Sequence, residues 1–202
     1  MLEKLARLLP WRSDGARESK AVSSTYFAFE GLAKPVWSPR DYVSFAREGM
    51  MRNAIVYRSI RMISEAAASV PLIAYQGHQQ LDEHPMLELL AGSNSGKTAF
   101  DLIEIVYGHL LVSGNAYIDA VAIANEVSGL HVLRPDRVRV MPGGDGWPEA
   151  FEYTAGQSKT VIRGDAVANV PRILHMKLFH PTSDYYGLRP LAASAAAIDV
   201  HN

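Results

Sequence analysis

The residues with the clearest chemical potential lie at positions 91–98, which read Ala-Gly-Ser-Asn-Ser-Gly-Lys-Thr and match a relaxed phosphate-binding loop. In such a loop the backbone N–H groups surround the phosphates, the lysine reaches the terminal phosphate and the Thr hydroxyl binds magnesium. This chemistry requires a strand before the loop and a helix after it. Gly92–Thr98 therefore makes a P-loop nucleotide-binding enzyme one alternative interpretation of the sequence.

The flanking sequence argues against this interpretation. Residues 85–90 contain no β-branched residue and have the apolar spacing of a helix, so the element before the loop is not a strand. No apolar strand that ends in Asp follows to hold magnesium. Thr98 and Asp101 also resemble a capping box, which gives Thr98 a structural role. We therefore predict no cofactor, no nucleotide binding and no enzymatic activity.

The other residues capable of chemistry form no catalytic or metal-binding pattern. The sequence has no cysteine, which excludes disulfides, thiolate catalysis and Cys-ligated zinc. Its seven histidines include no close pair on one helix face, and no Ser lies in a Gly-x-Ser-x-Gly elbow. His175 and His180 flank the end of a predicted strand, where either can pair with Asp184. We expect Asp119 on a strand surface, Asp136 in a turn, and no metal site.

Composition limits the remaining possibilities. The chain has 202 residues, of which 48% are hydrophobic and 20% charged, and this suits one globular domain with an arm. The formal net charge is −1, whereas proteins that wrap duplex DNA usually carry a strong basic excess. No apolar run approaches the roughly 20 residues that span a bilayer. We therefore expect neither tight direct DNA binding nor membrane insertion.

Residues 1–37 are predicted to form a flexible N-terminal arm. Residues 1–10 place four leucines at helical spacing before a proline, which predicts a short amphipathic helix that either docks or frays. Residues 13–37 are rich in Ser, Gly, Ala and charge, a composition typical of segments that order only against a neighbour. Aromatic residues interrupt this polarity, and they either form a subunit interface or pack on their own domain: Tyr26, Phe27, Phe29 and Trp37.

Residues 38–202 are predicted to form one α+β domain, in which a helical layer precedes a small antiparallel, meander-like β-sheet. Ser38, Asn53, His84 with Pro85, and Thr98 carry the start signals of four helices. The apolar side of the second helix is expected to comprise Ile55, Ile60, Ile63 and Ala67.

After Gly114 the apolar period changes from 3.6 to 2, which predicts strands. Turn residues at 135–136 and 142–146 separate them. The chain ends at the start of a helix, over residues 191–202. The strand candidates are residues 71–75, 116–122, 130–133, 138–141, 151–153, 160–162 and 173–178.

Four segments in a fixed order resemble the portal protein family of HK97-like tailed phages. They are residues 84–90 with Asn94 and the following helix, residues 114–118, residues 133–138, and residues 173–177 with 184–191. The chain departs from the family pattern at Ser93, where Pro is usual, and at Arg189, where Ser is usual. The family-motif residues, to which we assign structural roles, are His84, Pro85, Gly114, Asn115, Tyr117, Pro135, Asp136, His175, Gly187 and Pro190.

The resemblance implies the N-terminal wing portion of a portal subunit, with stem, clip and crown encoded by later sequence. Portals of phages, prophages and gene-transfer particles are dodecameric rings at a capsid vertex, through which DNA is packaged and ejected and to which the tail attaches. The implied partners are further copies of the chain, the major capsid protein, the terminase large subunit, the head–tail adaptor and double-stranded DNA that passes without sequence specificity. The implied location is a virion or gene-transfer particle, after synthesis in the host cytoplasm. A small α+β interaction module remains an alternative.

Overall fold

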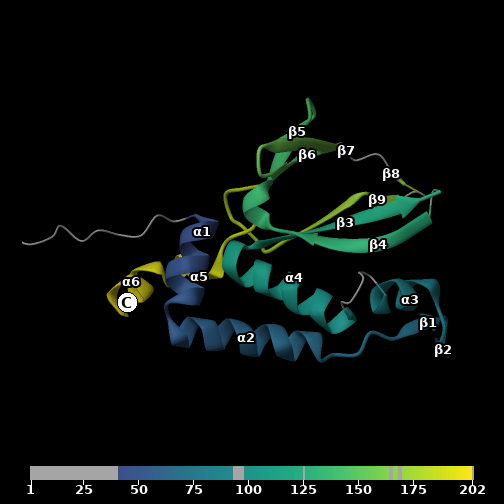
Figure 1. Cartoon of the computed structure of the whole chain (residues 1–202), viewed down its shortest axis with the longest axis horizontal. Coiled ribbons are helices and arrows are strands. Elements are labelled where there is room, and N and C mark those ends of the chain that lie inside the picture. Colours follow the sequence, from purple (N-terminus) through teal and green to yellow (C-terminus); the bar gives the residue numbers. More distant parts are fainter. Residues whose placement is uncertain (1–40, 93–97, 125, 164–165, 168–169, 202) are drawn as a thin grey trace, which may run out of the picture. The chain divides into compact units, whose positions relative to one another are not determined.

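The computed structural model describes residues 41–92, 98–124, 126–163, 166–167 and 170–201. Within these residues, helices α2, α3 and α4 lie on one side together with the β1-β2 hairpin, and the strands from β3 onward lie on the other (Figure 1). The predicted α+β class is therefore confirmed. The segment Gly92–Thr98 is described only at its two ends, and the arm of residues 1–37 lies outside the described residues.

Three helices begin at the residues that their sequence signals predict. Asn53 accepts hydrogen bonds from the backbone N–H groups of Ile55 and Val56 through Oδ1, at 3.1 Å each. His84 accepts one from Met86 through Nδ1. The helical elements are α1 (Tyr42–Ser44), the π-helix η1 (Phe45–Met51), α2 (Ala54–Ala68), α3 (Pro85–Ala91), α4 (Ala99–Ser113), the 3-10 helix η2 (Pro135–Arg137), α5 (Pro190–Ala193) and α6 (Ala195–His201).

The first helix begins later than predicted. Ser38 carries the predicted start signal, but the N-cap is Asp41, whose Oδ1 accepts from the backbone N–H of Ser44 at 2.8 Å. A carboxylate accepts hydrogen bonds from the unpaired N–H groups at a helix start as well as a hydroxyl does, so Asp41 can cap the helix in place of Ser38. The π-helix η1 then extends this helical segment to Met51.

Helix α2 buries a narrower face than predicted. Ile60 and Ser64 are buried against α4, whereas Ile55 is 62% exposed and Ile63 is 46% exposed. The reason is that α2 lies on the outside of the helical layer, covered on one side only (Figure 1). Two of the four residues on the predicted apolar side, Ile55 and Ile63, are therefore not buried by the described residues.

The strands form two three-stranded antiparallel sheets, ordered β10-β3-β4 and β5-β6-β7, and two short hairpins, β1-β2 and β8-β9. The sequence predicted one small meander-like sheet, but the strands after Gly114 divide between two three-stranded sheets, of which β5-β6-β7 is a simple meander. In the β10-β3-β4 sheet, β10 comes much later in the sequence than β3 and pairs with it as the edge strand. The strands are β1 (Ala74–Gln76), β2 (Gln79–Leu81), β3 (Asn115–Ile123), β4 (Glu126–Leu133), β5 (Val138–Pro142), β6 (Pro148–Ala155), β7 (Ser158–Arg163), β8 (Ala166–Val167), β9 (Val170–Pro171) and β10 (Ile173–Lys177).

The β10-β3-β4 sheet is the middle layer of the domain. Side chains alternate along a strand, so Ala116 and Ile118 pack against Leu102 and Val106 of α4. From the opposite face, Tyr117 joins a core made with the β5-β6-β7 sheet. Burying each large aliphatic side chain contributes roughly 2 kcal/mol. Because β3 is covered on both faces, it is the most enclosed strand of the described chain.

This double coverage corrects the expectation for Asp119. Its side chain is not at a strand surface: Asp119 is buried, and Arg172 donates to it from Nε at 3.0 Å. A charge buried without a partner is costly, so the ion pair explains how a carboxylate sits between two layers.

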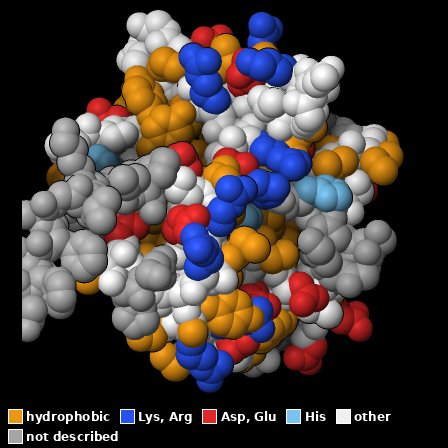
Figure 2. Space-filling view, turned by 60° about the vertical axis from the view of Figure 1, so that its left-hand side comes forward, with side chains coloured by type: hydrophobic (Ala, Val, Ile, Leu, Met, Phe, Trp, Pro, Cys, Tyr) orange, Lys and Arg blue, Asp and Glu red, His pale blue; other side chains and the backbone are white. Residues whose placement is uncertain are grey.

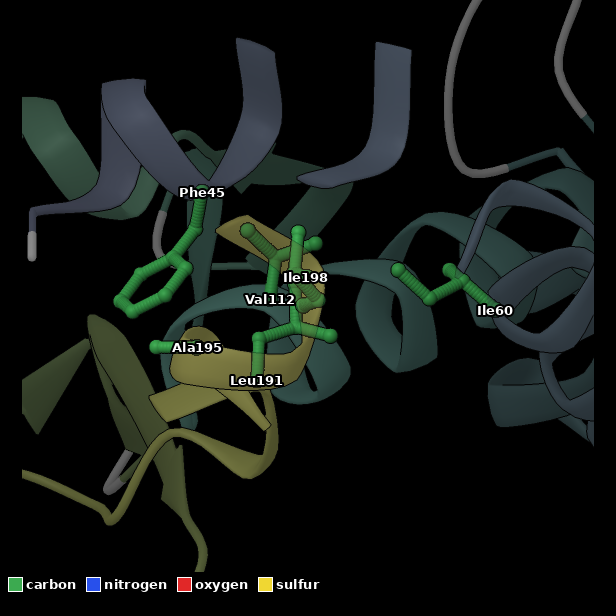
Figure 3. Packing of buried hydrophobic residues seen from close by; sticks show 6 residues of the cluster. All are labelled: Phe45, Ile60, Val112, Leu191, Ala195 and Ile198. Carbon is green, nitrogen blue, oxygen red and sulfur yellow. The ribbon is translucent and has the colours of Figure 1, made fainter. Parts of the chain in front are cut away.

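A third core joins the two ends of the described chain. Figure 3 shows Phe45 of η1 and Val112 of α4 beside Leu191, Ala195 and Ile198 of the last two helices. The predicted helix at residues 191–202 is therefore present, as α5 and α6, and it packs on the first helical segment.

Candidate functional site

The family-motif residues of three separate segments meet where α4 ends. Gly114 ends the helix with φ +74°, a left-handed conformation that favours glycine. Its carbonyl oxygen accepts the backbone N–H of Leu178 at 2.9 Å. Gly187 lies so close that a Cβ on it would overlap this carbonyl and reach 2.7 Å from the Leu178 nitrogen. Two glycines thus permit direct backbone contact between segments 72 residues apart.

Asn115 fastens this contact with its side-chain amide. Its Nδ2 donates to the Ser113 carbonyl at 2.9 Å. Its Oδ1 accepts the Gly187 backbone N–H at 2.8 Å and lies 3.1 Å from Nε2 of His175. Since Oδ1 can only accept, Nε2 of His175 carries a proton. Asn115 therefore links α4, β10 and the loop after β10 in one buried network.

His175 is held neutral in this network. Burial is the main cause that lowers its pKa to about 4, and the nearby Lys177 ammonium acts in the same direction. The ring stacks on Tyr117 with centroids 4.3 Å apart, and Tyr117 meets Phe151 edge-on at 6.0 Å. Burial also raises the pKa of the Tyr117 hydroxyl. Neutral stacked rings suit packing between two sheets.

The predicted pairing of His175 or His180 with Asp184 is wrong. His175 bonds Asn115 instead, and His180 accepts from the Thr182 backbone N–H through Nδ1 at 3.1 Å. The Asp184 backbone carbonyl, not its carboxylate, accepts from Lys177 Nζ. His180 is thus engaged within its own loop, whereas His175 is engaged by a residue 60 positions away.

Pro135 and Asp136 lie in the reversal η2, as their turn signal predicts. Arg134 holds Asp136 through two bonds, Nε to Oδ1 at 3.1 Å and Nη2 to Oδ2 at 2.7 Å. A cavity of about 360 Å³ opens beside them. Its lining includes Tyr42, Asn115, Tyr117, Pro135, Asp136 and Tyr186.

Two polar links of this region were not foreseen from the sequence. The hydroxyl of Tyr42 lies 3.1 Å from Nδ1 of His109, and burial lowers the pKa of His109 to about 4. Tyr186 accepts the backbone N–H of Val140 at 3.0 Å. Each joins residues more than 45 positions apart, and local sequence patterns carry no signal for such pairs.

The remaining motif residues start helices. Pro85 occupies the first turn of α3 after its cap His84, and Pro190 occupies the first turn of α5. Leu191 then enters the core of Figure 3. Together these residues set where helices begin and how they join the sheets.

The phosphate-loop resemblance lacks its required framework. Residues 93–97 lie outside the described residues, but the element before Gly92 is helix α3 and not a strand. The Thr98 hydroxyl takes part in a capping box, with its Oγ1 2.8 Å from Oδ2 of Asp101. Residues 93–97 are therefore flanked by a helix on each side, α3 before them and α4 after them.

In the described parts of the chain, no group of three or more His, Asp or Glu side chains is placed to hold a metal ion. Nor is any helix there long and apolar enough to cross a membrane. The interface candidates Tyr26, Phe27, Phe29 and Trp37 lie outside the described residues.

Comparison with known proteins gives a consistent result. A family model described as "Phage portal protein" matches residues 54–202. The chain is similar to a solved structure described as the neck of an empty GTA particle with C6 symmetry, at 44% identity and a TM-score of 0.76 over 85% of this chain and 46% of that one. It is also similar to one described as the neck of a native GTA particle with C12 symmetry, at 41% identity and a TM-score of 0.71 over 85% of this chain and 45% of that one.

Two curated relatives are uncharacterized proteins of Rickettsia. The one from Rickettsia bellii (strain RML369-C) is 27% identical over 74% of this chain and 39% of its own length. The one from Rickettsia felis (strain ATCC VR-1525 / URRWXCal2) is 24% identical over 95% of this chain and 48% of its own length. The chain spans less than half the length of the proteins it matches.

Proposed function

The chain belongs to the phage portal protein family, and from this premise we infer that it is part of a structural subunit that assembles with further copies into a portal ring. The observation that carries the proposal is the 44% identity to the neck protein of a GTA particle, with a TM-score of 0.76. GTA denotes a gene transfer agent. The location we propose is accordingly a virion or gene-transfer particle.

The described domain suits a mechanical role. Its motif residues form backbone contacts, helix starts and a neutral buried network, and these fix the relative positions of two sheets and a helical layer. A ring that passes DNA requires such rigidity, and it gains nothing from strong phosphate contacts that would slow the duplex. The net charge of −1 agrees with this requirement.

The partners we propose follow from a portal role. They are further copies of the chain in a ring of twelve, the major capsid protein, the terminase large subunit and the head–tail adaptor, with double-stranded DNA passing through the channel. Packaging would take its energy from the terminase. The subunit itself would hold no cofactor and catalyse no reaction.

Ring assembly is the direct test. The full-length protein is purified and examined by mass photometry and negative-stain electron microscopy over a range of concentrations. We expect closed rings with a mass near twelve subunits. A protein that remains monomeric at every concentration, with native circular dichroism, contradicts the proposal.

Calorimetry separates the portal from the nucleotide-binding alternative. Titration with magnesium-ATP is expected to give no binding heat in the wild type or in Lys97→Ala. Micromolar affinity in the wild type that is lost in Lys97→Ala would establish a phosphate loop and contradict our assignment of Gly92–Thr98.

A further inference from the structure

An apolar groove opens at the edge of the helical layer, between residues 68–72, helix α3 and the start of α4. Its volume is about 230 Å³. Large apolar side chains in and around it are 49–64% exposed, and exposed apolar clusters of this kind mark interaction surfaces. These exposed residues are Val70, Leu72, Ile73, Tyr75 and Met86.

Three exposed carboxylates lie on or just before helix α3, which is one of the elements that line this groove. Asp82 and Glu83 lie between β2 and α3, and Glu88 lies on α3 itself. All three are exposed, and none forms an ion pair with a described residue. From residue 62 to residue 133, the part of the chain that the structure describes contains no Lys or Arg. Among the described residues, the groove is thus lined mainly by apolar side chains, and the charges on and just before α3 are negative.

The outer face of the β5-β6-β7 sheet has the opposite charge. Val138 and Val140 point into the core, so alternation directs Arg139 outward; in the same way Ile162 is buried and Arg163 is outward. Both arginines are exposed, and neither pairs with a described acid. Val161 is exposed beside them. Figure 2 shows Lys and Arg side chains at the top of the view, the level of this sheet in Figure 1.

Lys159 and Glu152 complete this sheet face. They pair with each other at 3.4 Å, so the two charges cancel and Arg139 and Arg163 set the sign of the surface. Met141 adds a second partly exposed apolar side chain. The face thus combines positive charge with apolar contact area, as the groove combines negative charge with apolar area.

The two surfaces lie on opposite outer layers of the domain. The middle sheet contacts β5-β6-β7 through Tyr117 and Ile173 on one face, and contacts α4 and α3 through Ala116 and Ile118 on the other. Closed rings need two different patches per subunit, each contacting the other on the next copy. In a twelvefold ring such as the related C12 neck, each contact turns the next copy by only about 30°. Patches on opposite layers meet that requirement.

We propose that the apolar groove of one copy, together with the carboxylates on and just before α3, receives the basic outer face of the β5-β6-β7 sheet of the adjacent copy. Glu83 and Glu88 then face Arg139 and Arg163, while Leu72 and Met86 cover Val161. The inference rests on the proposed ring function and names the surfaces that build the ring. Because charges are screened over about 8 Å at physiological salt, high salt should weaken but not abolish the apolar contact.

Charge reversal tests the proposal in the full-length protein. One variant carries Glu83→Lys and Glu88→Lys, a second carries Arg139→Glu and Arg163→Glu, and a third carries all four substitutions. Mass photometry measures the concentration at which half of the subunits are in rings. We expect this concentration to rise at least about tenfold in the first two variants and to return toward the wild-type value in the third, since each charge pair is then restored in reverse.

A control variant and a folding measurement distinguish a specific loss of ring contacts from other effects of the substitutions. Arg58→Glu, an exposed reversal on α2 away from both surfaces, is expected to leave assembly unchanged. Circular dichroism melting verifies that each variant is folded, and recovery in the fourfold variant cannot arise from unfolding. If wild-type rings form but neither twofold reversal weakens them, this inference is overturned and the ring function stands. Equal weakening without recovery in the fourfold variant, which would indicate another occupant of the groove, also overturns it. If the wild type forms no ring, the proposed function itself fails.

Discussion

At the residue scale, the amide of Asn115 determines how the helical and β-sheet layers are joined. It satisfies the backbone N–H of Gly187, the ring N–H of His175 and the carbonyl of Ser113, all at a buried position. A buried polar group left without a partner costs about 1–3 kcal/mol. One side chain therefore stabilises three segments, and the conformation of each depends on the other two.

The close backbone contact at Gly187 leads to a first prediction. Gly187→Ala introduces a Cβ that overlaps the Gly114 carbonyl, so the hydrogen bond from Leu178 must shift as well. We expect the free energy of unfolding to fall by about 3 kcal/mol or more, since overpacking typically costs about 1–3 kcal/mol and the atoms that must move here belong to the backbone. Urea denaturation followed by circular dichroism measures this.

A glycine in helix α4 provides the matched control. A Cβ at Gly108 meets no atom within 4 Å. Because alanine is favoured over glycine in a helix interior, Gly108→Ala should raise stability by up to about 1 kcal/mol. Equal effects of the two substitutions would contradict the role assigned to the Gly114–Gly187 contact.

Buried histidines give a second prediction, on pH. The folded-state pKa values of His109 and His175 are about 4, below the ordinary value of 6.5. Between these values the unfolded chain binds protons that the folded chain does not. Their contribution to stability is therefore complete above pH 6.5 and is lost as pH falls toward 4. Urea midpoints at pH 7.5, 5.5 and 4.5 should decrease in that order.

Substitution at His175 isolates this effect. His175→Gln keeps an N–H that can reach Asn115 but does not titrate, so its loss of stability on acidification should be smaller than that of the wild type. His180→Gln, at an exposed loop position, is the control and should follow the wild-type curve. Parallel curves for wild type and His175→Gln would refute the prediction.

At the element scale, capping residues decide where helices begin. The third prediction concerns Thr98, whose hydroxyl and backbone N–H exchange hydrogen bonds with Asp101 at the start of α4. Thr98→Ala should lower the free energy of unfolding by about 1 kcal/mol, whereas Thr98→Ser, which keeps the capping hydroxyl, should leave it nearly unchanged. Chemical denaturation compares the two variants. Equal stability of all three proteins would show that the cap contributes nothing.

Features that depend on neighbouring residues could be predicted from the sequence, whereas features that depend on distant residues could not. Helix starts at Asn53, His84 and Thr98 depend on residues within four positions, so local patterns suffice. The division of strands into two sheets depends on β10 pairing with β3, and the partner of Asp119 lies 53 residues away. Neither has a local signature. For the same reason the motif residues were identifiable one by one, but their meeting at Asn115 was not.

Apolar periodicity overstated the buried face of α2 for a related physical reason. Ile55 and Ile63 match a helical stripe, yet they are exposed because only one side of this helix is covered. Periodicity reports which residues are suited to burial, and the packing of neighbouring elements determines which are buried.

At the scale of the whole molecule, three layers present two unlike outer surfaces. Such a subunit is built for directional contact, since each surface complements the other and not itself. Closed rings, and not two-fold dimers, result from contacts of that type. Strand β3 lies between helix α4 and the β5-β6-β7 sheet. This position gives the domain its layered core, and it also places the two proposed contact surfaces on opposite sides.

The fourth prediction concerns the N-terminal arm. Deleting residues 1–37 from the full-length protein should leave the domain folded and weaken its rings, because aromatic residues contribute strongly to interfaces. Circular dichroism and size-exclusion chromatography measure the two effects separately. The aromatic residues concerned are Tyr26, Phe27, Phe29 and Trp37.

Either of two results would reject this arm model. Unchanged rings would remove the arm from the interface. An unfolded truncated protein would show that the aromatic residues pack on their own domain.

The bond from Gly187 to Asn115 also has a consequence for the order of events during synthesis. Its partners are 72 residues apart, and closing a loop of that length costs about 4 kcal/mol in chain entropy. At roughly 5–20 residues per second, Asn115 leaves the ribosome about 4–14 s before Gly187 does. During that interval strand β3 has neither β10 nor the following loop beside it. The nascent chain thus displays an unpaired strand edge, and a chaperone that shields this edge should raise the yield of correctly folded protein.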